Sequence, residues 1–139
     1  MIRFFVAAVP RPGGSKKAFR HAHTGKVIVT DDAKGNREWK AAVSLFAREA
    51  YQGPPLTGAL RLSVQFLMPR PKSHYRTNGL LKPNAPTWHT KKPDTTKLVR
   101  STEDALNGVL WVDDTLIVRQ TAEKVYGDEV GAWVEVTQV

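Results

Sequence analysis

Three carboxylates stand at the two ends of one short segment of this sequence, with Asp94 at its start and Asp113 and Asp114 at its end. Carboxylate oxygens are hard ligands that suit Mg²⁺. A divalent cation held against a phosphate can polarise the phosphate and an attacking water. These residue types therefore permit phosphodiester chemistry if the fold brings the two ends of the segment together. In the plain alternative, Asp94 only caps a helix and Asp113-Asp114 is only a turn.

The residues between these acids predict a helix that holds the two ends together. Pro93 disfavours helix at Lys92, and Asp94 can accept hydrogen bonds from the first free backbone N–H groups. Asn107-Gly108 offers a left-handed stop at the other end. The positions i, i+4, i+7 and i+8 form one buried stripe, made of Leu98, Thr102, Ala105 and Leu106. Three carboxylates could thus meet at one end of a packed unit.

The charge distribution favours a polyanionic partner. The formal net charge is +8 and the pI is about 10.0, and residues 1–30 and 50–93 contain no acid. The second of these segments carries Arg61, Arg70, Lys72, Arg76, Lys82, Lys91 and Lys92. A small acidic cluster within a basic surface is what metal-dependent cleavage of a phosphodiester needs, because the bases hold phosphate and the acids hold the cation.

The same residues resemble the signature of the RusA family of Holliday junction resolvases. The shared pattern is Lys-Pro-Asp-(x)2-Lys-Leu-(x)-Arg-(x)4-Ala-Leu-Asn-Gly-Val-(x)3-Asp-Asp, within about residues 91–119. Members of that family are small phage and prophage endodeoxyribonucleases that act as dimers with magnesium. The resemblance implies a RusA-like fold and a metal-dependent endonuclease that resolves four-way DNA by paired symmetric cleavage in recombination and repair.

The resemblance also implies roles for individual residues. Asp94 and Asp114 correspond to metal ligands for Mg²⁺, for which Mn²⁺ can substitute, with Asp113 beside them. Arg100 stands where the family has a catalytically important basic residue. The chain departs from the family at Thr96, where a second acid is usual. A threonine hydroxyl can ligate magnesium but supplies no charge, which lowers the expected metal affinity.

A mechanism and two rival functions follow from this reading. Lys97 or Arg100 would stabilise the charge that develops on the phosphate or the leaving oxygen. A homodimer would supply two matched incisions to a two-fold symmetric junction. One rival is a non-catalytic junction-binding protein that lost cleavage through Thr96. The other is a single-strand or RNA-binding module built on the long basic loop.

Two basic segments are candidate nucleic-acid contacts, although each could be plain solvated charge. The first follows the N-terminal strand, and the second is a loop over residues 69–93 in which aromatic residues alternate with basic ones, a pattern that suits stacking on bases. The predicted phosphate contacts are Lys16, Lys17, Arg20, Arg70, Lys72, Arg76, Lys91 and Lys92. His21 and His23 point the same way from a strand but lack a third ligand nearby, so hydrogen bonding is favoured over metal binding.

Composition excludes several other classes. Residues 1–139 are short enough for a single domain. The chain has no cysteine, which removes disulfides, zinc fingers and thiol nucleophiles. The glycine pair near Lys16 lacks the full phosphate-loop pattern, so no nucleotide cofactor is expected. Since no signal peptide or membrane span is evident, we expect a cytoplasmic protein of a bacterial or phage-infected cell.

Hydropathy periodicity predicts an α+β fold, in which two main helices pack on a mixed β-sheet. The strand over residues 2–9 is apolar on both sides and is therefore expected at the centre of the sheet. The other predicted elements are a hairpin at 19–30, a helix at 36–51, a strand at 60–68, a helix from 94, and strands at 116–121 and 132–139.

Overall fold

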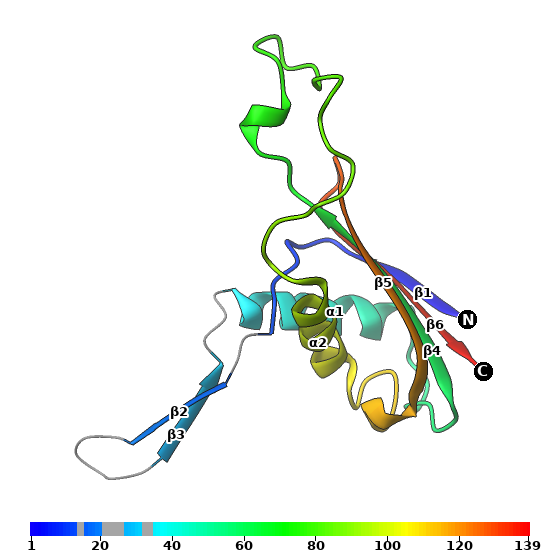
Figure 1. Ribbon diagram of the computed structural model, residues 1–139. Coiled ribbons are helices and arrows are strands. Elements are labelled where there is room, and N and C mark those ends of the chain that lie inside the picture. Colours follow the sequence, from blue (N-terminus) through cyan, green and yellow to red (C-terminus); the bar gives the residue numbers. More distant parts are fainter. Residues whose placement is uncertain (14–15, 21–26, 32–34) are drawn as a thin grey trace.

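The computed structural model describes residues 1–13, 16–20, 27–31 and 35–139 (Figure 1). A four-stranded sheet forms the framework, and two helices lie side by side against one of its faces (Figure 1). The strands are β1 (Ile2–Val6), β2 (Lys16–Arg20), β3 (Val27–Asp31), β4 (Leu60–Met68), β5 (Ile117–Tyr126) and β6 (Gly131–Gln138). The helices are α1 (Asn36–Ala50) and α2 (Thr95–Leu106), with short 3-10 turns η1 (Lys72–His74) and η2 (Asp114–Leu116).

The sheet is mixed, which confirms the predicted α+β class. Its strand order is β1-β6-β4-β5. Strand β4 pairs in parallel with β5, whereas the β1–β6 and β4–β6 pairs are antiparallel. Parallel neighbours need a crossover connection, and here α2 is the helix of that crossover. The site-bearing segment therefore joins two adjacent strands of one sheet.

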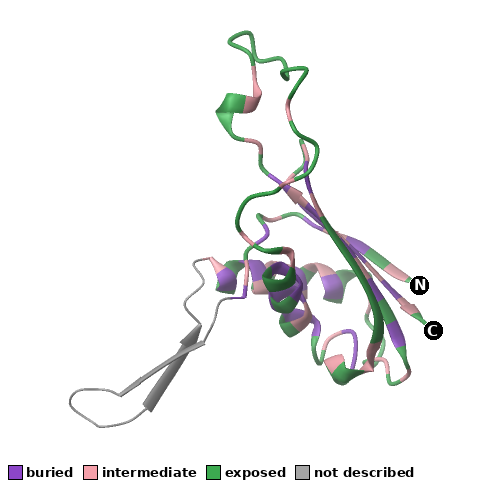
Figure 2. Cartoon of the chain, viewed as in Figure 1, coloured by how far each residue is buried: buried purple, intermediate pink, exposed green. Residues whose placement is uncertain are grey.

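The core lies between the helices and the sheet (Figure 2). Strand β4 buries every second residue, as its alternation predicted, and these residues are Leu60, Leu62, Val64, Phe66 and Met68. Helix α1 buries Trp39, Val43 and Ala47, which are spaced four residues apart. Helix α2 buries the whole predicted stripe, which consists of Leu98, Thr102, Ala105 and Leu106. None of the described helices is long and apolar enough to cross a membrane.

The prediction that the first strand lies centrally is wrong, because β1 is at the edge of the sheet and pairs, among the described strands, with β6 alone. Phe4 and Val6 face the core. Phe5 points to the other side and packs edge-on against the ring of Trp133, with 5.0 Å between the ring centroids. This cross-strand aromatic pair accounts for the apolar residue on the second side of β1.

Strands β2 and β3 form a separate antiparallel pair, which confirms the predicted hairpin. The turn between them, with His21 and His23, lies outside the described residues. The side chains of Lys16, Lys17 and Arg20 also lie outside the described part of the structure, so their predicted phosphate contacts stay predictions.

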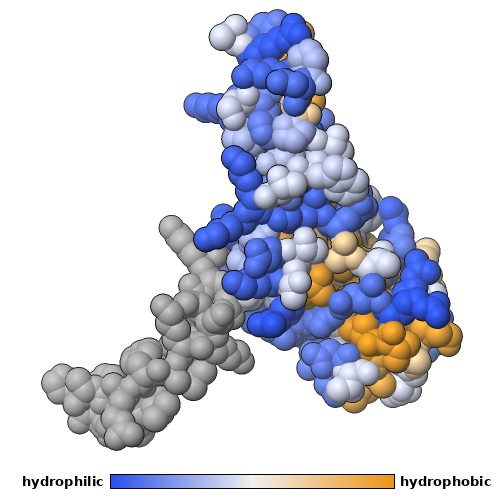
Figure 3. All heavy atoms as spheres, in the orientation of Figure 1, coloured by the Kyte–Doolittle hydropathy of each residue, from blue (hydrophilic) through white to orange (hydrophobic). Residues whose placement is uncertain are grey.

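Residues 69–93, which we call the arm, project from the sheet beyond the end of β4 (Figure 1). The outer part is a tight reversal in which Tyr75 and Leu81 form a β-bridge and Gly79 has a φ of 85°. The returning part runs along β5, where Trp88 bridges Val125. On the face seen in Figure 3, hydrophilic residues cover most of the arm. The predicted long loop is therefore present, and it is held by backbone pairing at its base.

Candidate functional site

An open pocket of about 360 Å³ lies between α2 and the start of β5. We call it the α2–β5 pocket, and its lining residues are Thr96, Val99, Arg100, Glu103, Asp104, Asp114 and Gln120. Thr96, Arg100 and Glu103 are spaced by four and three residues, so they share one face of the helix. The buried stripe of α2 packs against the core, and this packing turns the neighbouring face, which carries Thr96, Arg100 and Glu103, toward β5.

The structure brings three of the predicted site residues together in this pocket: Thr96, Arg100 and Asp114. Asp94 occupies the N-cap position of α2, but its side chain makes no capping hydrogen bond. The Asp94 side chain is 66% exposed, and its Oδ2 lies 4.0 Å from Nζ of Lys97. Asp94 and Lys97 therefore form an exposed pair at the mouth of the helix, outside the described lining of the pocket.

Asp113 and Asp114 follow a buried anchor and one exposed residue. Leu110 and Trp111 are fully buried, Val112 is exposed, and η2 begins at Asp114. The Thr115 hydroxyl donates a hydrogen bond to Oδ2 of Asp113 over 2.7 Å. Asp114 is consequently the member of the acidic pair that lines the α2–β5 pocket, whereas Asp113 is engaged on the exposed side of the turn.

Sequence reasoning missed Glu103, although it lines the same pocket as Asp114. Nε2 of Gln120 donates a hydrogen bond to Oε1 of Glu103. Partial burial raises the pKa of Glu103, and the nearby charges of Asp114 and Asp104 raise it further. The signal that could have revealed Glu103 is its spacing of seven residues from Thr96, which is two helical turns.

The chain entering the β2–β3 hairpin crosses the N-terminal half of α2. The Gly13 N–H donates to the carbonyl oxygen of Lys97 over 2.8 Å, and the Ser101 hydroxyl donates to the carbonyl oxygen of Arg11 over 2.6 Å. A Cβ at Gly13 would lie 3.3 Å from the backbone nitrogen of Ser101. These contacts hold residues 11–13 against the N-terminal half of α2.

The base of the arm is attached to β5 on the other side of the site. Nζ of Lys124 donates hydrogen bonds of 2.6 Å to the carbonyl oxygens of Lys91 and Pro93. Desolvation lowers the pKa of Lys124, and the negative charge of Asp94 opposes that shift. These bonds fix the residues that immediately precede Asp94, and with them the start of α2.

Tyr126, at the end of β5, anchors the arm through three side chains. The guanidinium of Arg70 lies 5.1 Å from the centroid of the Tyr126 ring, and the rings of His74 and His89 approach it edge-on at 4.8 and 4.9 Å. Desolvation lowers the pKa of both histidines, with added repulsion from nearby cations. Since Arg70 also donates to the carbonyl oxygen of Pro86 over 2.8 Å, its guanidinium already has partners within the protein.

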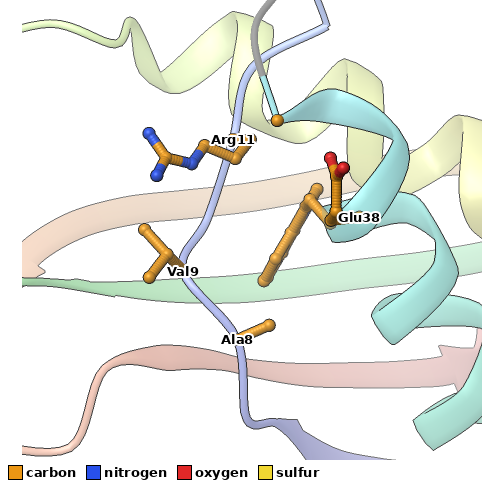
Figure 4. Close-up of a pocket in the computed structure, with 6 residues that line it drawn as sticks. Ala8, Val9, Arg11 and Glu38 are labelled. Carbon is orange, nitrogen blue, oxygen red and sulfur yellow. The ribbon is translucent and has the colours of Figure 1, made fainter.

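Two further hollows lie on the N-terminal side of α2. One, of about 400 Å³, lies between the segment after β1 and the start of α1, with Val9, Arg11 and Glu38 around it (Figure 4). The other, of about 520 Å³, extends from Arg11 to Lys92 at the base of the arm. Neither has two carboxylates among its described lining residues, so the α2–β5 pocket is the better candidate for a cation.

The donors around the α2–β5 pocket fit a hard divalent cation that is shared with a substrate. Magnesium is commonly bound by one or two carboxylates together with water and substrate phosphate. Glu103, Asp104 and Asp114 supply three carboxylates to the pocket, and Thr96 adds a neutral oxygen. Oδ2 of Asp104 lies 3.8 Å from Nζ of Lys40. Among the described residues, no group of three or more His, Cys, Asp or Glu side chains is placed to hold a metal ion. Phosphate and water would therefore have to complete any cation site in this pocket.

The fold and the site together define a small α+β protein in which a pocket with acidic side chains opens between α2 and β5. Residues 10–137 match the family described as Endodeoxyribonuclease RusA. The chain is also 31% identical over 150 aligned positions to the protein YqaN of Bacillus subtilis (strain 168), an alignment that covers 99% of this chain and 96% of YqaN. The chain belongs to the RusA endodeoxyribonuclease family, as the motif around residues 91–119 predicted.

Proposed function

We propose that this chain is a metal-dependent endodeoxyribonuclease that resolves four-way DNA junctions by paired symmetric incisions. Membership of the RusA family supports endonuclease activity on branched DNA. The observation that carries the proposal is the α2–β5 pocket, in which Asp114 and Arg100 face one space from opposite elements. A carboxylate that can hold a cation and a guanidinium that can hold phosphate are thereby adjacent.

The proposed metal ligands are Asp94, Asp114, Asp113 and Thr96, with Mg²⁺ as the physiological ion and Mn²⁺ as a substitute. A bound divalent ion would polarise the scissile phosphate and the attacking water. Arg100, and Lys97 at the mouth of the helix, would stabilise the charge that develops on the phosphoryl oxygens. Asp94 is exposed and free of capping bonds, so its carboxylate is available for this role.

The proposed substrate contacts come from both basic segments that flank the site. Lys72, Arg76, Lys91 and Lys92 are exposed on the arm, where phosphate contacts would position the duplex without reading its sequence. The indole of Trp88 is 56% exposed and could stack on a distorted base. We further propose a homodimer, because two identical sites can make two matched cuts in a two-fold symmetric junction.

One observation favours the rival function of a junction-binding protein that does not cut. Thr96 lines the α2–β5 pocket at the position where the family usually has an acid. The loss of one negative ligand would weaken metal binding while leaving the basic surface intact.

A labelled four-way junction, incubated with and without Mg²⁺, separates the two functions. We expect paired symmetric nicks only with the metal. Asp94→Asn and Asp114→Asn should abolish nicking while junction binding persists, and Asp128→Asn, which removes the same charge from an exposed turn, should cut normally. Normal cutting by both site variants would refute the assigned ligands. A wild-type protein that binds junctions and never cuts them would establish the rival function.

A further inference from the structure

The α2–β5 pocket contains an acid, Glu103, that the sequence pattern did not single out. Glu103 lies on the same helix face as Thr96 and Arg100, and it faces Asp114 across the pocket. We infer that Glu103 is the second acidic ligand of the divalent cation, and that it takes over the role that an acid at position 96 would have. This inference rests on the proposed nuclease function and adds a residue to it.

The geometry of a helix allows this exchange of positions. Seven residues separate Thr96 from Glu103, which is two turns and a rise of about 10 Å. Long side chains on a helix lean back toward its N-terminus, so the Glu103 carboxylate reaches toward the level of Arg100. A glutamate, with one more methylene than an aspartate, is suited to that reach. Thr96 and Glu103 line one continuous pocket, which shows that both positions open onto the same space.

The surroundings of Glu103 hold its carboxylate in one orientation. Its Oε1 accepts the hydrogen bond from Gln120, which leaves Oε2 and the remaining lone pairs for another partner. The neighbouring acid Asp104 has a different engagement, because its Oδ2 lies 3.8 Å from Nζ of Lys40. Glu103 and Asp114 are therefore the two pocket carboxylates without a described cationic partner in the protein. Gln120 acts as a positioning residue for Glu103.

A purely structural role for Glu103 is the competing explanation, since the bond to Gln120 joins α2 to β5. Direct metal binding distinguishes the two roles. Isothermal titration of Mn²⁺ alone into the full-length wild type and Glu103→Gln measures the affinity without any dependence on cleavage. The matched control is Glu123→Gln, which removes the same charge from a carboxylate that accepts a bond from Gln65 outside the pocket. Melting temperatures in metal-free buffer report whether each variant is folded.

We expect Glu103→Gln to melt as a folded protein and to lose more than about tenfold in Mn²⁺ affinity, a loss that even outer-shell partners of metal ligands can cause. The control should bind as the wild type does. Thr96→Asp, introduced into Glu103→Gln, should restore Mn²⁺ binding and junction nicking, because it returns the acid to the position usual in the family.

Two results would overturn the inference, and they have different meanings. If Glu103→Gln binds Mn²⁺ and nicks junctions as the wild type does, Glu103 is not a ligand and the proposed nuclease stands without it. If the wild type neither binds Mn²⁺ nor nicks junctions, the proposed function fails, and the role of Glu103 fails with it. A folded Glu103→Gln that is not rescued by Thr96→Asp would contradict the exchange of positions.

Discussion

Nζ of Lys124 on the edge strand donates a 2.6 Å hydrogen bond to the carbonyl oxygen of Pro93, the residue that precedes Asp94. A second bond of the same length reaches the carbonyl oxygen of Lys91. The ammonium group therefore joins strand β5 to the base of the arm at the point where helix α2 begins. This contact links the position of the exposed acid Asp94 to the sheet.

Replacing Lys124 with methionine tests that link. Lys124→Met keeps a long side chain but frees both carbonyl oxygens, so we expect a loss of about 1 kcal/mol in the free energy of unfolding. The larger effect should be a lower nicking rate at saturating Mg²⁺, because the start of α2 is less fixed. Arg61→Met removes an exposed cation from β4 as a control. Equal nicking rates for Lys124→Met and Arg61→Met would disprove the positioning role.

A buried hydrogen bond between the two helices should stabilise the whole site. The indole N–H of Trp39 donates to the Thr102 hydroxyl over 3.3 Å, and that hydroxyl donates to the carbonyl oxygen of Leu98 over 2.8 Å. Thr102→Val keeps the shape but leaves the indole N–H unpaired, which should cost about 1–3 kcal/mol. Urea unfolding measures the change.

A double-mutant cycle with Trp39→Phe isolates this bond. Phenylalanine has no N–H to leave unpaired, so Thr102→Val should cost less in that background than in the wild type. If Thr102→Val costs the same in both backgrounds, the bond contributes nothing measurable and its effect must be assigned to packing.

The aromatic anchor of the arm gives a prediction about protection from proteolysis. Tyr126→Leu removes the ring that Arg70, His74 and His89 contact. Aromatic pairs contribute about 0.5–1.5 kcal/mol beyond burial, so we expect a total loss of about 1–3 kcal/mol. Trypsin should then cut the arm after Arg76 faster than it cuts the arm of the wild type. Unchanged cleavage rates in the arm would mean that its backbone bonds alone hold it.

The raised pKa of Glu103 predicts a dependence of stability on pH. Its pKa lies above the usual 4.5, so the protonated form is favoured by folding. The stabilisation is complete below the unfolded pKa and is lost as the pH rises through the folded pKa. In metal-free buffer, Glu103→Gln should therefore gain stability relative to the wild type as the pH rises from below the usual 4.5 toward neutrality.

Melting temperatures of both proteins in EDTA, at the two ends of that pH range, measure this difference. The gain should be absent from Glu123→Gln, whose carboxylate lies outside the α2–β5 pocket. A constant difference between Glu103→Gln and the wild type across the range would show that the pocket does not perturb Glu103.

Periodicity predicted the elements that bury an apolar face, and it failed where burial is partial. Helix α2 and strand β4 follow their predicted patterns closely. Strand β5 runs to Tyr126, five residues beyond the predicted end at 121, because exposed polar residues such as Glu123 fill its outer half. The outer half of β5 is held in an extended form by its pairing with β4. No local sequence pattern reveals that pairing. The edge position of β1 has the same kind of cause, because it depends on pairing with β6.

The site was predictable as far as local spacing determined it. Thr96, Arg100 and Asp114 were expected near one another, and they line one pocket. The roles of Asp94, Asp113 and Lys97 stay predictions. Glu103 was not found because an acid on a helix usually lies on a solvated face, and only the placement of β5 beside α2 gives it a partner.

The length of β5 sets the distance between the α2–β5 pocket and the base of the arm. Six residues of extended strand separate Gln120, in the pocket, from Tyr126, under the arm, which is roughly 20 Å at about 3.3 Å per residue. Along a DNA strand that length corresponds to about six nucleotides. In the proposed nuclease, the arm would therefore contact the duplex that flanks the branch point. The branch point itself would lie at the α2–β5 pocket.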